Sequence, residues 1–292
     1  MESNHLKHRS IRPYTLGLLG ILSFSLSFPA TKIAVSELSP WFVVAMRSLI
    51  AGILGLFWLI PNRKQVIANF DALKIPTLVQ VAGVVLGFPI LSSIALKSAG
   101  SSHGALVIAI TPILTAIFSA ILMKRSRSRL FWSCGILATI VTLMTVYWNA
   151  DLTLQNADAL LLLAAILVSI GYAFGGKATS VIGGPIAISM AVSAVLPVST
   201  LGVIVFWPDH VPSPASILSV SYLGSVSMFF GFILWYEGLS QGPAEQISLL
   251  QSFQLFFTYI AGYYILGENL SLAQLVPSVL VVALIFLSKF AK

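Results

Sequence analysis

Ten long apolar segments dominate the chain, and short stretches rich in Pro, Gly or charged residues separate them. A helix needs about 20 mainly apolar residues to cross the hydrocarbon core of a bilayer. Strands of a membrane β-barrel would instead alternate apolar and polar positions, and this chain does not show that alternation. The pattern predicts an all-α integral membrane protein whose ten transmembrane helices cover residues 14–34, 41–60, 76–96, 103–123, 130–148, 157–176, 185–207, 215–236, 243–266 and 271–288.

Composition supports this prediction and narrows the chemistry. The chain is 58% hydrophobic and only 9% charged, whereas a soluble domain carries roughly 25% charged residues. Its single cysteine, Cys134, lies in an apolar segment, so neither an intramolecular disulfide nor a cysteine metal cluster can form. We expect no cofactor and no metal.

Lys and Arg concentrate on alternate loops. With ten spans both termini lie on one side, and nearly all Lys and Arg outside the helices fall on that side. The positive-inside rule therefore predicts a multi-pass protein of the cell inner (plasma) membrane with both termini in the cytoplasm. The run KRSRSR (124–129) then becomes a cytoplasmic loop that sets topology and contacts anionic lipid headgroups, so nucleic acid is not an expected partner.

The two halves of the chain resemble each other. ILSFSLSFPATK (21–32) aligns with ILVSIGYAFGGK (166–177), and Pro40 aligns with Pro185 at the same offset of 145 residues. A repeat of five helices must insert upside down relative to its twin, and inverted repeats are characteristic of transporters. We therefore divide the chain into a cytoplasmic tail (1–13), a first five-helix repeat (14–148) and a second five-helix repeat (157–288).

The ninth apolar segment carries the most polar residues. At 100° per residue, six of them share one face of a helix, while Gln246 and Gln254 lie outside it. Polar side chains in hydrocarbon face either a wet cavity or a neighbouring helix, and both alternatives stay open here. The shared face holds Glu245, Ser248, Gln251, Ser252, Thr258 and Tyr259, and we predict that Ser248, Gln251, Ser252 and Tyr259 bind substrate.

Aromatic and cationic residues supply further candidates for substrate binding. Tyr172 lies inside the sixth segment, whereas Trp235 and Tyr236 lie near a span end, where anchoring at the membrane interface is the alternative. Arg47 lies about seven residues inside the second segment and needs a polar partner there. Lys32, at the end of the first segment, can contact a substrate carboxylate or extend to the headgroups.

Three ionisable residues are candidates for proton coupling, and one proline is a candidate hinge. His103 opens the fourth segment, and histidine is the residue type that most often changes charge near neutral pH; a purely structural role at the helix end is the alternative. Glu237 and Glu245 lie near helix ends, where simple solvation is the alternative role. Pro112 removes a backbone hydrogen bond in mid-membrane, which permits either a hinge or a static kink.

Several of these motifs together resemble a known family. They are F-x-x-x-K (Phe28 to Lys32), the proline-to-arginine entry of the second helix (Pro40 to Arg47, one residue longer here), SAGSSHGALVIAITPILTAIFSAIL with its central proline, and LGENLS (266–271). The chain thus resembles the EamA-like branch of the drug/metabolite transporter superfamily over essentially its whole length. It departs from that pattern in KRSRSR, which replaces a Gly-Glu turn, and in Gln251 to Gln254, where the family often has proline.

The resemblance implies a central cavity between the repeats and a secondary transporter of small organic metabolites. Because EamA-like carriers are thought mostly to export metabolites, we expect an amino-acid exporter, aromatic amino acids included, that works by alternating access. Transport of nucleotide sugars or sugar phosphates is the runner-up, and a non-transporting membrane scaffold or receptor is the alternative of another class. An enzyme is not expected, because the sequence holds no catalytic motif such as H-E-x-x-H or G-x-S-x-G. The expected partners are a small-molecule substrate and membrane lipids, and a homodimer is left open.

Overall fold

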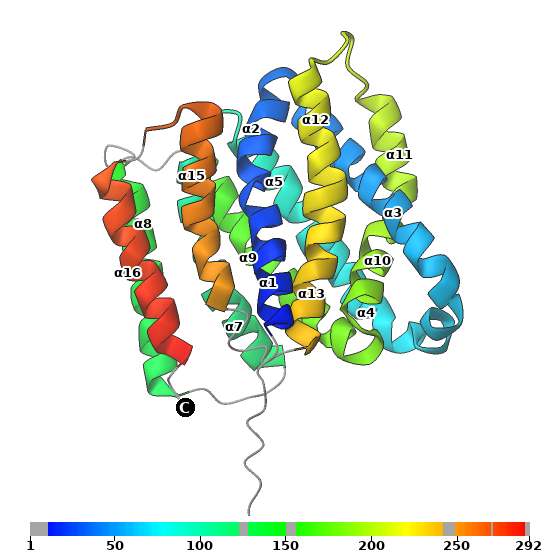
Figure 1. The fold of residues 1–292 in the computed structure, drawn as a ribbon, viewed down its shortest axis with the longest axis horizontal. Helices are drawn as coiled ribbons and strands as arrows, with labels where there is room; N and C mark the ends of the chain where they lie inside the picture. Colours follow the sequence, from blue (N-terminus) through cyan, green and yellow to red (C-terminus); the bar gives the residue numbers. More distant parts are fainter. Residues whose placement is uncertain (1–10, 123–127, 150–155, 242–248, 270, 290–292) are drawn as a thin grey trace, which may run out of the picture.

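The computed structural model of the protein describes residues 11–122, 128–149, 156–241, 249–269 and 271–289, with no strand among them. Its helices stand side by side in one bundle (Figure 1). The first half contains α1 (Arg12–Ser25), α2 (Ser27–Glu37), α3 (Pro40–Ala68), α4 (Phe70–Gln80), the π-helical segment η1 (Val81–Gly87), α5 (Phe88–Ala95), α6 (Ser101–Ile108), α7 (Thr111–Leu122) and α8 (Arg129–Asn149). The second half contains α9 (Asn156–Ile182), α10 (Gly184–Ala194), α11 (Leu196–Val205), α12 (Pro214–Tyr222), the π-helical segment η2 (Leu223–Phe230), α13 (Gly231–Gln241), the 3-10 helix η3 (Leu249–Phe253), α15 (Gln254–Leu266) and α16 (Leu272–Lys289).

The apolar helices are those of a multi-pass membrane protein. Six are long and apolar enough to cross a bilayer, and a seventh results if α10 and α11, which meet at a bend of 43°, form one span. In the described part of the chain, the apolar stretches Trp132–Thr145 and Leu272–Leu284 are shorter. An all-helical fold is therefore confirmed, while the full set of ten spans stays a prediction. The six long spans are Arg12–Glu37, Pro40–Ala68, Phe70–Ala95, Ser101–Leu122, Asn156–Ile182 and Pro214–Gln241.

The two halves begin at opposite ends of the bundle. In Figure 1, α1 begins at the lower end and α2 ends at the upper end. Lys32 Nζ, on α2, donates to the carbonyl oxygen of Ala99 at 2.8 Å, which places the start of α6 at the upper end as well. His103 in the first turn of α6 contacts Asp158 in the first turn of α9. We call this upper end, marked by Glu37, His103, Asp158 and Glu268, the distal face.

Helix pairing across the halves follows one rule. Helix α1, which opens the first half, packs on α13 of the second half. In the same way α9, which opens the second half, packs on α4, η1 and α5 of the first half. The pairs α3 with α10 and α11, α6 with α15, and α8 with α16 each join a helix to its own counterpart. Two repeats related by a two-fold axis pack in this way, although the exact repeat boundaries stay a prediction.

Buried apolar side chains form two large clusters within the bundle. One includes Leu106 and Leu161, and the other includes Ile188 and Met228. Phe88 packs against both clusters. The centre of the bundle, where the two halves meet, therefore lies between two apolar cores.

Glycine permits the closest approach between η1 and α9. A Cβ added to Gly83 would lie 2.3 Å from the backbone oxygen of Leu167, and one added to Gly171 would lie 2.7 Å from Val84 Cγ2. Small residues let helix backbones approach where lipid provides no hydrophobic force between helices. Side chains larger than that of glycine are therefore disfavoured at this contact, because the backbone atoms they would meet have little room to move.

We expect Gly83→Ala to lower the free energy of unfolding by about 1–3 kcal/mol, because the new methyl group overpacks a backbone contact. Gly176→Ala is the matched control, because nothing lies within 4 Å of its added Cβ. That change should be neutral or stabilising by up to about 1 kcal/mol. Thermal unfolding of both purified variants measures the difference, and equal melting temperatures would contradict the packing argument.

Candidate functional site

Helix interruptions gather around the middle of the bundle. The π-helical segments η1 and η2 occupy corresponding places, since Leu223 lies 142 positions after Val81. Helices α1 and α2 are interrupted at Leu26, and a turn at residues 109–110 separates α6 from α7. Irregular backbone at membrane depth is tolerated where it is buried in protein or lines a cavity, and π-helical bulges occur frequently at functional sites.

A cavity lies among these interruptions and takes its walls from both halves. The space between its side chains, its opening included, is about 930 Å³. One wall is aromatic, formed by Phe24, Phe28, Phe88, Tyr172 and Phe232. The polar residues of the wall include Ser27, Arg47, Thr111, Ser227, Gln251, Ser252 and Thr258.

The aromatic wall is itself well packed. Phe28 and Phe88 stack with ring centroids 6.0 Å apart and an interplanar angle of 14°. Phe232 packs between Phe24, at 4.7 Å, and Tyr172, at 6.0 Å. Such aromatic pairs hold one another in place, so the cavity offers preformed flat apolar surfaces to a ligand.

Some polar groups of the wall are already satisfied. Ser27 Oγ and Ser227 Oγ lie 2.6 Å apart and join the two halves. Thr258 Oγ1 donates to the backbone oxygen of Ser25 at 2.8 Å. These hydrogen bonds hold η2 against α2 and α15 against α1.

Other polar groups of the wall have no partner among the described residues. They are Arg47 Nε, Thr111 Oγ1 and Ser252 Oγ, all buried. Buried polar atoms in folded proteins are nearly always hydrogen-bonded, so each exception needs an explanation. These three line the same cavity, whereas the other buried polar atoms without a partner in the described part of the protein are spread over several helices, which makes this cavity the candidate ligand site.

Five of the predicted site residues line this cavity: Arg47, Pro112, Tyr172, Gln251 and Ser252. They come from α3, α7, α9 and η3, and the tertiary structure brings them together. Pro112 is the second residue of α7, directly after the turn that interrupts the fourth span. Their roles in binding and as a hinge stay predictions.

Two other predicted substrate-binding residues are committed to structural contacts outside the cavity wall. Lys32 is held at the distal face by Ala99, and Tyr259 shares a hydrogen bond of 3.0 Å with Ser278 of α16. Lys32 therefore ties α2 to the connection between α5 and α6, and Tyr259 joins α15 to α16. Neither belongs to the site that we describe.

Trp235 and Tyr236 also lie away from the cavity wall. Trp235 packs against α1, where a Cβ on Gly20 would lie 3.0 Å from Trp235 Cβ. Tyr236 packs against Gly184 and accepts a hydrogen bond of 3.4 Å from Gln80 Nε2. Both rings fill contacts between helices, and Phe232, one turn earlier on α13, faces the cavity in their place. Ser248 and Glu245 lie outside the described residues.

Sequence periodicity missed several residues of the wall. Neither Ser27 nor Ser227 was predicted to line a site; they meet where α2 begins, directly after the interruption at Leu26, and where η2 is π-helical. Gln254 lies outside the polar sector of an ideal helix, yet it lines the cavity. The 3-10 segment η3 precedes it, and three residues per turn rotate side chains away from their α-helical positions.

The coupling candidates occupy different places. His103 Nε2 and Asp158 Oδ1 lie 2.5 Å apart, and Asp158 is buried. Glu237 is near the end of α13, where it accepts a hydrogen bond from Gln241 on its exposed surface. His103 is therefore part of a contact between the halves, while Glu237 pairs within its own helix.

Glu268 forms a second contact between the halves at the distal face. Helix α15 ends at Gly267 with φ of 67°, and the next carboxylate reaches the start of α6. It accepts hydrogen bonds of 2.6–2.9 Å from the backbone nitrogen and hydroxyl of both Ser101 and Ser102. Gly262 leaves room for it, since an added Cβ would lie 2.8 Å from Glu268 Oε2. The LGENLS motif thus supplies an anion to a helix N-terminus, where negative charge is favoured.

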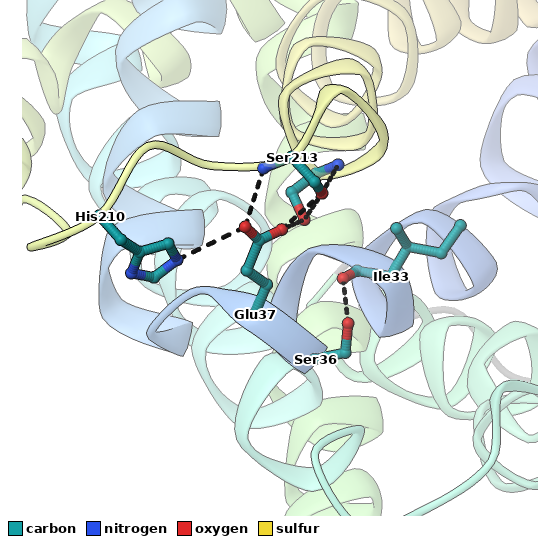
Figure 2. A network of polar contacts seen from close by, with 6 residues as sticks. Ile33, Ser36, Glu37, His210 and Ser213 are labelled. Carbon is teal, nitrogen blue, oxygen red and sulfur yellow. Dashed lines mark hydrogen bonds and ion pairs between the residues drawn. The ribbon is translucent and has the colours of Figure 1, made fainter.

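Glu37 forms the third such contact, in the opposite direction. It is the last residue of α2, and it accepts hydrogen bonds from Ser213 N at 2.8 Å and from the hydroxyls of Ser213 and Ser216 at 2.5 Å (Figure 2). His210 Nε2 lies 3.4 Å from Glu37 Oε1, the oxygen that also accepts from Ser213 N. Ser213 caps the start of α12 in the second half. We call Glu37, Asp158 and Glu268 the distal carboxylates, and each of them bridges the two halves.

The Glu268 contact predicts a pH dependence. Burial alone would raise the pKa of Glu268, but hydrogen bonds from Ser102 and Ser101 outweigh burial and lower it below its ordinary value of 4.5. A carboxylate with a lowered pKa in the folded state stabilises the protein above its unfolded pKa, and this stabilisation is lost as the pH falls through the folded pKa. The melting temperature should therefore fall as the pH drops below 4.5.

We expect Glu268→Gln to remove that part of the acid sensitivity and to cost about 1–3 kcal/mol at neutral pH, because charged hydrogen bonds are lost. Asp71→Asn is the control, since the Asp71 side chain is 93% exposed. It should change stability by no more than about 0.5 kcal/mol. Melting curves of the three proteins between pH 3 and pH 8 test this, and parallel curves for wild type and Glu268→Gln would refute it.

Comparison with known proteins identifies the family. The model of the EamA-like transporter family matches the chain twice, over residues 11–147 and 155–290. The uncharacterized transporter YdeK of Bacillus subtilis (strain 168) is 32% identical over 280 residues, which cover 94% of this chain and 96% of the relative. An uncharacterized transporter of Archaeoglobus fulgidus is 26% identical over 275 residues, covering 92% and 95%.

A solved crystal structure shares the fold. Its TM-score is 0.67 over 94% of this chain and 95% of the other, at 18% identity. Two matches to one family model, a multi-pass helical bundle and a relative above 30% identity along nearly the whole chain point the same way. The chain therefore belongs to the EamA-like transporter family of the drug/metabolite transporter superfamily.

Proposed function

We propose that this transporter is a secondary carrier of small organic metabolites in the cell inner membrane, with amino acids, aromatic ones included, as its first substrate class. The observation that carries the proposal is the cavity of about 930 Å³ between the two halves. Its aromatic wall suits an apolar side chain, and its hydroxyl and amide groups suit a polar backbone. Net export, with both termini in the cytoplasm, is the direction that we propose.

Alternating access fits the way in which the halves are joined. The distal carboxylates fasten one half to the other at the distal face of the bundle. If the halves exchange roles, these contacts break while the cavity opens toward the distal face, and equivalent repeats make the two states similar in energy. The helix interruptions around the cavity, including the one before Pro112, are where we place the bending.

A phosphorylated substrate is less well matched. A phosphate group carries about −1.5 to −2 charges at neutral pH. Arg47 is the single Lys or Arg among the described residues that line the cavity. Lys32, the other cation that sequence analysis assigned to a substrate anion, is held at the distal face by Ala99. Nucleotide sugars and sugar phosphates are therefore the second candidate class.

Transport by purified protein in liposomes tests the proposal. The vesicles are offered labelled amino acids, nucleotide sugars and sugar phosphates, each with and without a pH gradient. We expect amino-acid flux, and dependence on the gradient would direct attention to the His103–Asp158 pair. Flux confined to phosphorylated solutes would support the second class. Absence of all flux, from protein shown to be folded, would favour a scaffold or receptor.

Two tyrosines distinguish the cavity from the contacts around it. Tyr172 lines the cavity, whereas Tyr259 bonds to Ser278 outside it. We expect Tyr172→Ala and Gln251→Ala to weaken apparent substrate affinity by about tenfold, which is the effect of roughly 1.4 kcal/mol of lost contact. Tyr259→Phe should leave affinity unchanged, even if it lowers stability. Normal affinity in both cavity variants would show that the site lies elsewhere.

A further inference from the structure

We propose that the Arg47 guanidinium binds the carboxylate of the substrate and that the transported class is organic monocarboxylates with an apolar or aromatic body, for which an α-amino group is dispensable. This inference rests on the proposed function and specifies the substrate of the same cavity. It starts from the three buried polar atoms of the cavity wall that lack partners, on Arg47, Thr111 and Ser252.

Arg47 is a buried cation that no described residue neutralises. It is 5% exposed, it lines the cavity, and its Nε has no hydrogen-bond partner in the described part of the chain. The ion pairs found among those residues join Lys74 to Asp71 and place a histidine beside Asp158 or Glu37, so none includes Arg47. An arginine inside a membrane protein is costly unless an anion or strong acceptor pairs with it. A ligand carboxylate supplies both, in the bidentate geometry that guanidinium favours.

Thr111 and Ser252 add neutral hydrogen-bonding groups to the lining of the same cavity. Thr111 belongs to the first half and Ser252 to the second, and the hydroxyl oxygen of each is buried without a partner among the described residues. A hydroxyl both donates and accepts. It can therefore contact a second carboxylate oxygen, a keto group, a hydroxyl or an amine on the neighbouring carbon with little discrimination between them.

The described part of the wall offers no matching group for an ammonium ion, since none of the described residues that line the cavity is Asp or Glu. Among these residues an α-ammonium group would meet only neutral oxygens and aromatic faces, whose attraction for a cation is modest. The carboxylate is therefore the charge that the site recognises, while the amino group adds little to affinity.

The rest of the wall defines the body of the ligand. Phe24, Phe28, Phe88 and Phe232 present ring surfaces around the cavity. One cation matches one negative charge, so a monocarboxylate is neutralised in the site, whereas a phosphate dianion would retain excess charge. A ligand with a single carboxylate and a flat apolar body would pair with Arg47 and pack against the aromatic rings at the same time.

Matched analogues of one compound test this directly on the purified, reconstituted protein. The probes are phenylalanine, phenylpyruvate, 3-phenyllactate, phenylalaninamide and phenethylamine, each measured as an inhibitor of flux and as a ligand in thermal-shift binding. We expect the three carboxylates to bind within about threefold of one another, because they share the charged hydrogen bonds. The amide and the amine should bind about tenfold more weakly or worse, since a hydrogen bond to a charged group carries that much affinity.

Arg47→Gln should remove the advantage of carboxylates over the amide, and Arg47→Lys should restore part of it. If Arg47→Gln does not fold, Thr111→Val and Ser252→Ala keep the cation, and each should weaken the binding of all three carboxylates together.

Equal carboxylate preference in wild type and Arg47→Gln would overturn the Arg47 assignment while leaving amino-acid transport intact. Strong binding of phenylalanine with none of phenylpyruvate would overturn the class. Neither flux nor binding of any probe would instead count against the proposed function itself.

Discussion

Hydrocarbon cannot accept or donate hydrogen bonds, and every main feature of this protein depends on that constraint. Backbone groups inside the bilayer must pair within their own segment, which favours long helices such as α3 and α9. Where the helices are interrupted, at η1, η2, η3 and the turn before α7, the irregular backbone is gathered around one internal space. Polar side chains follow the same rule: one group of them joins the halves at the distal face, and another lines the cavity.

The two polar regions differ in how completely they are satisfied. At the distal face, Glu37 and Glu268 each receive several hydrogen bonds from serines at the start of a helix in the other half. On the cavity wall, Arg47, Thr111 and Ser252 keep buried polar atoms without partners among the described residues. Satisfied groups hold a structure together, whereas each unsatisfied buried group needs an explanation. A bound substrate is the explanation that we propose for the three on the cavity wall.

The reciprocal pairing of the halves explains why the cavity lies where it does. Each half supplies helices that pack on counterparts of the other, so neither half encloses the space alone. Arg47 and Thr111 come from the first half, and Tyr172 and Ser252 come from the second. In the alternating access that we propose, a relative movement of the halves would change the contacts with a bound solute from both sides, which is how a repeat architecture can link binding to a change of state.

Much of the fold could be predicted from sequence, because apolar length and spacing are local properties. They determined the helical segments, the division into two related halves and the membrane class, and the LGENLS and proline motifs indicated the family. Arg47 also stood out, since a charge seven residues inside an apolar segment requires a partner wherever the helix packs. What only the tertiary structure decided is which polar side chains share a space. Tyr259 turns to Ser278 and Lys32 to Ala99, while Ser27, Ser227 and Gln254 reach the cavity. Periodicity gives the angle of a residue about an ideal helix axis, but π-helical and 3-10 segments change that angle. Which helix lies next to a residue, and at what depth, is set by packing between halves that are far apart in the chain.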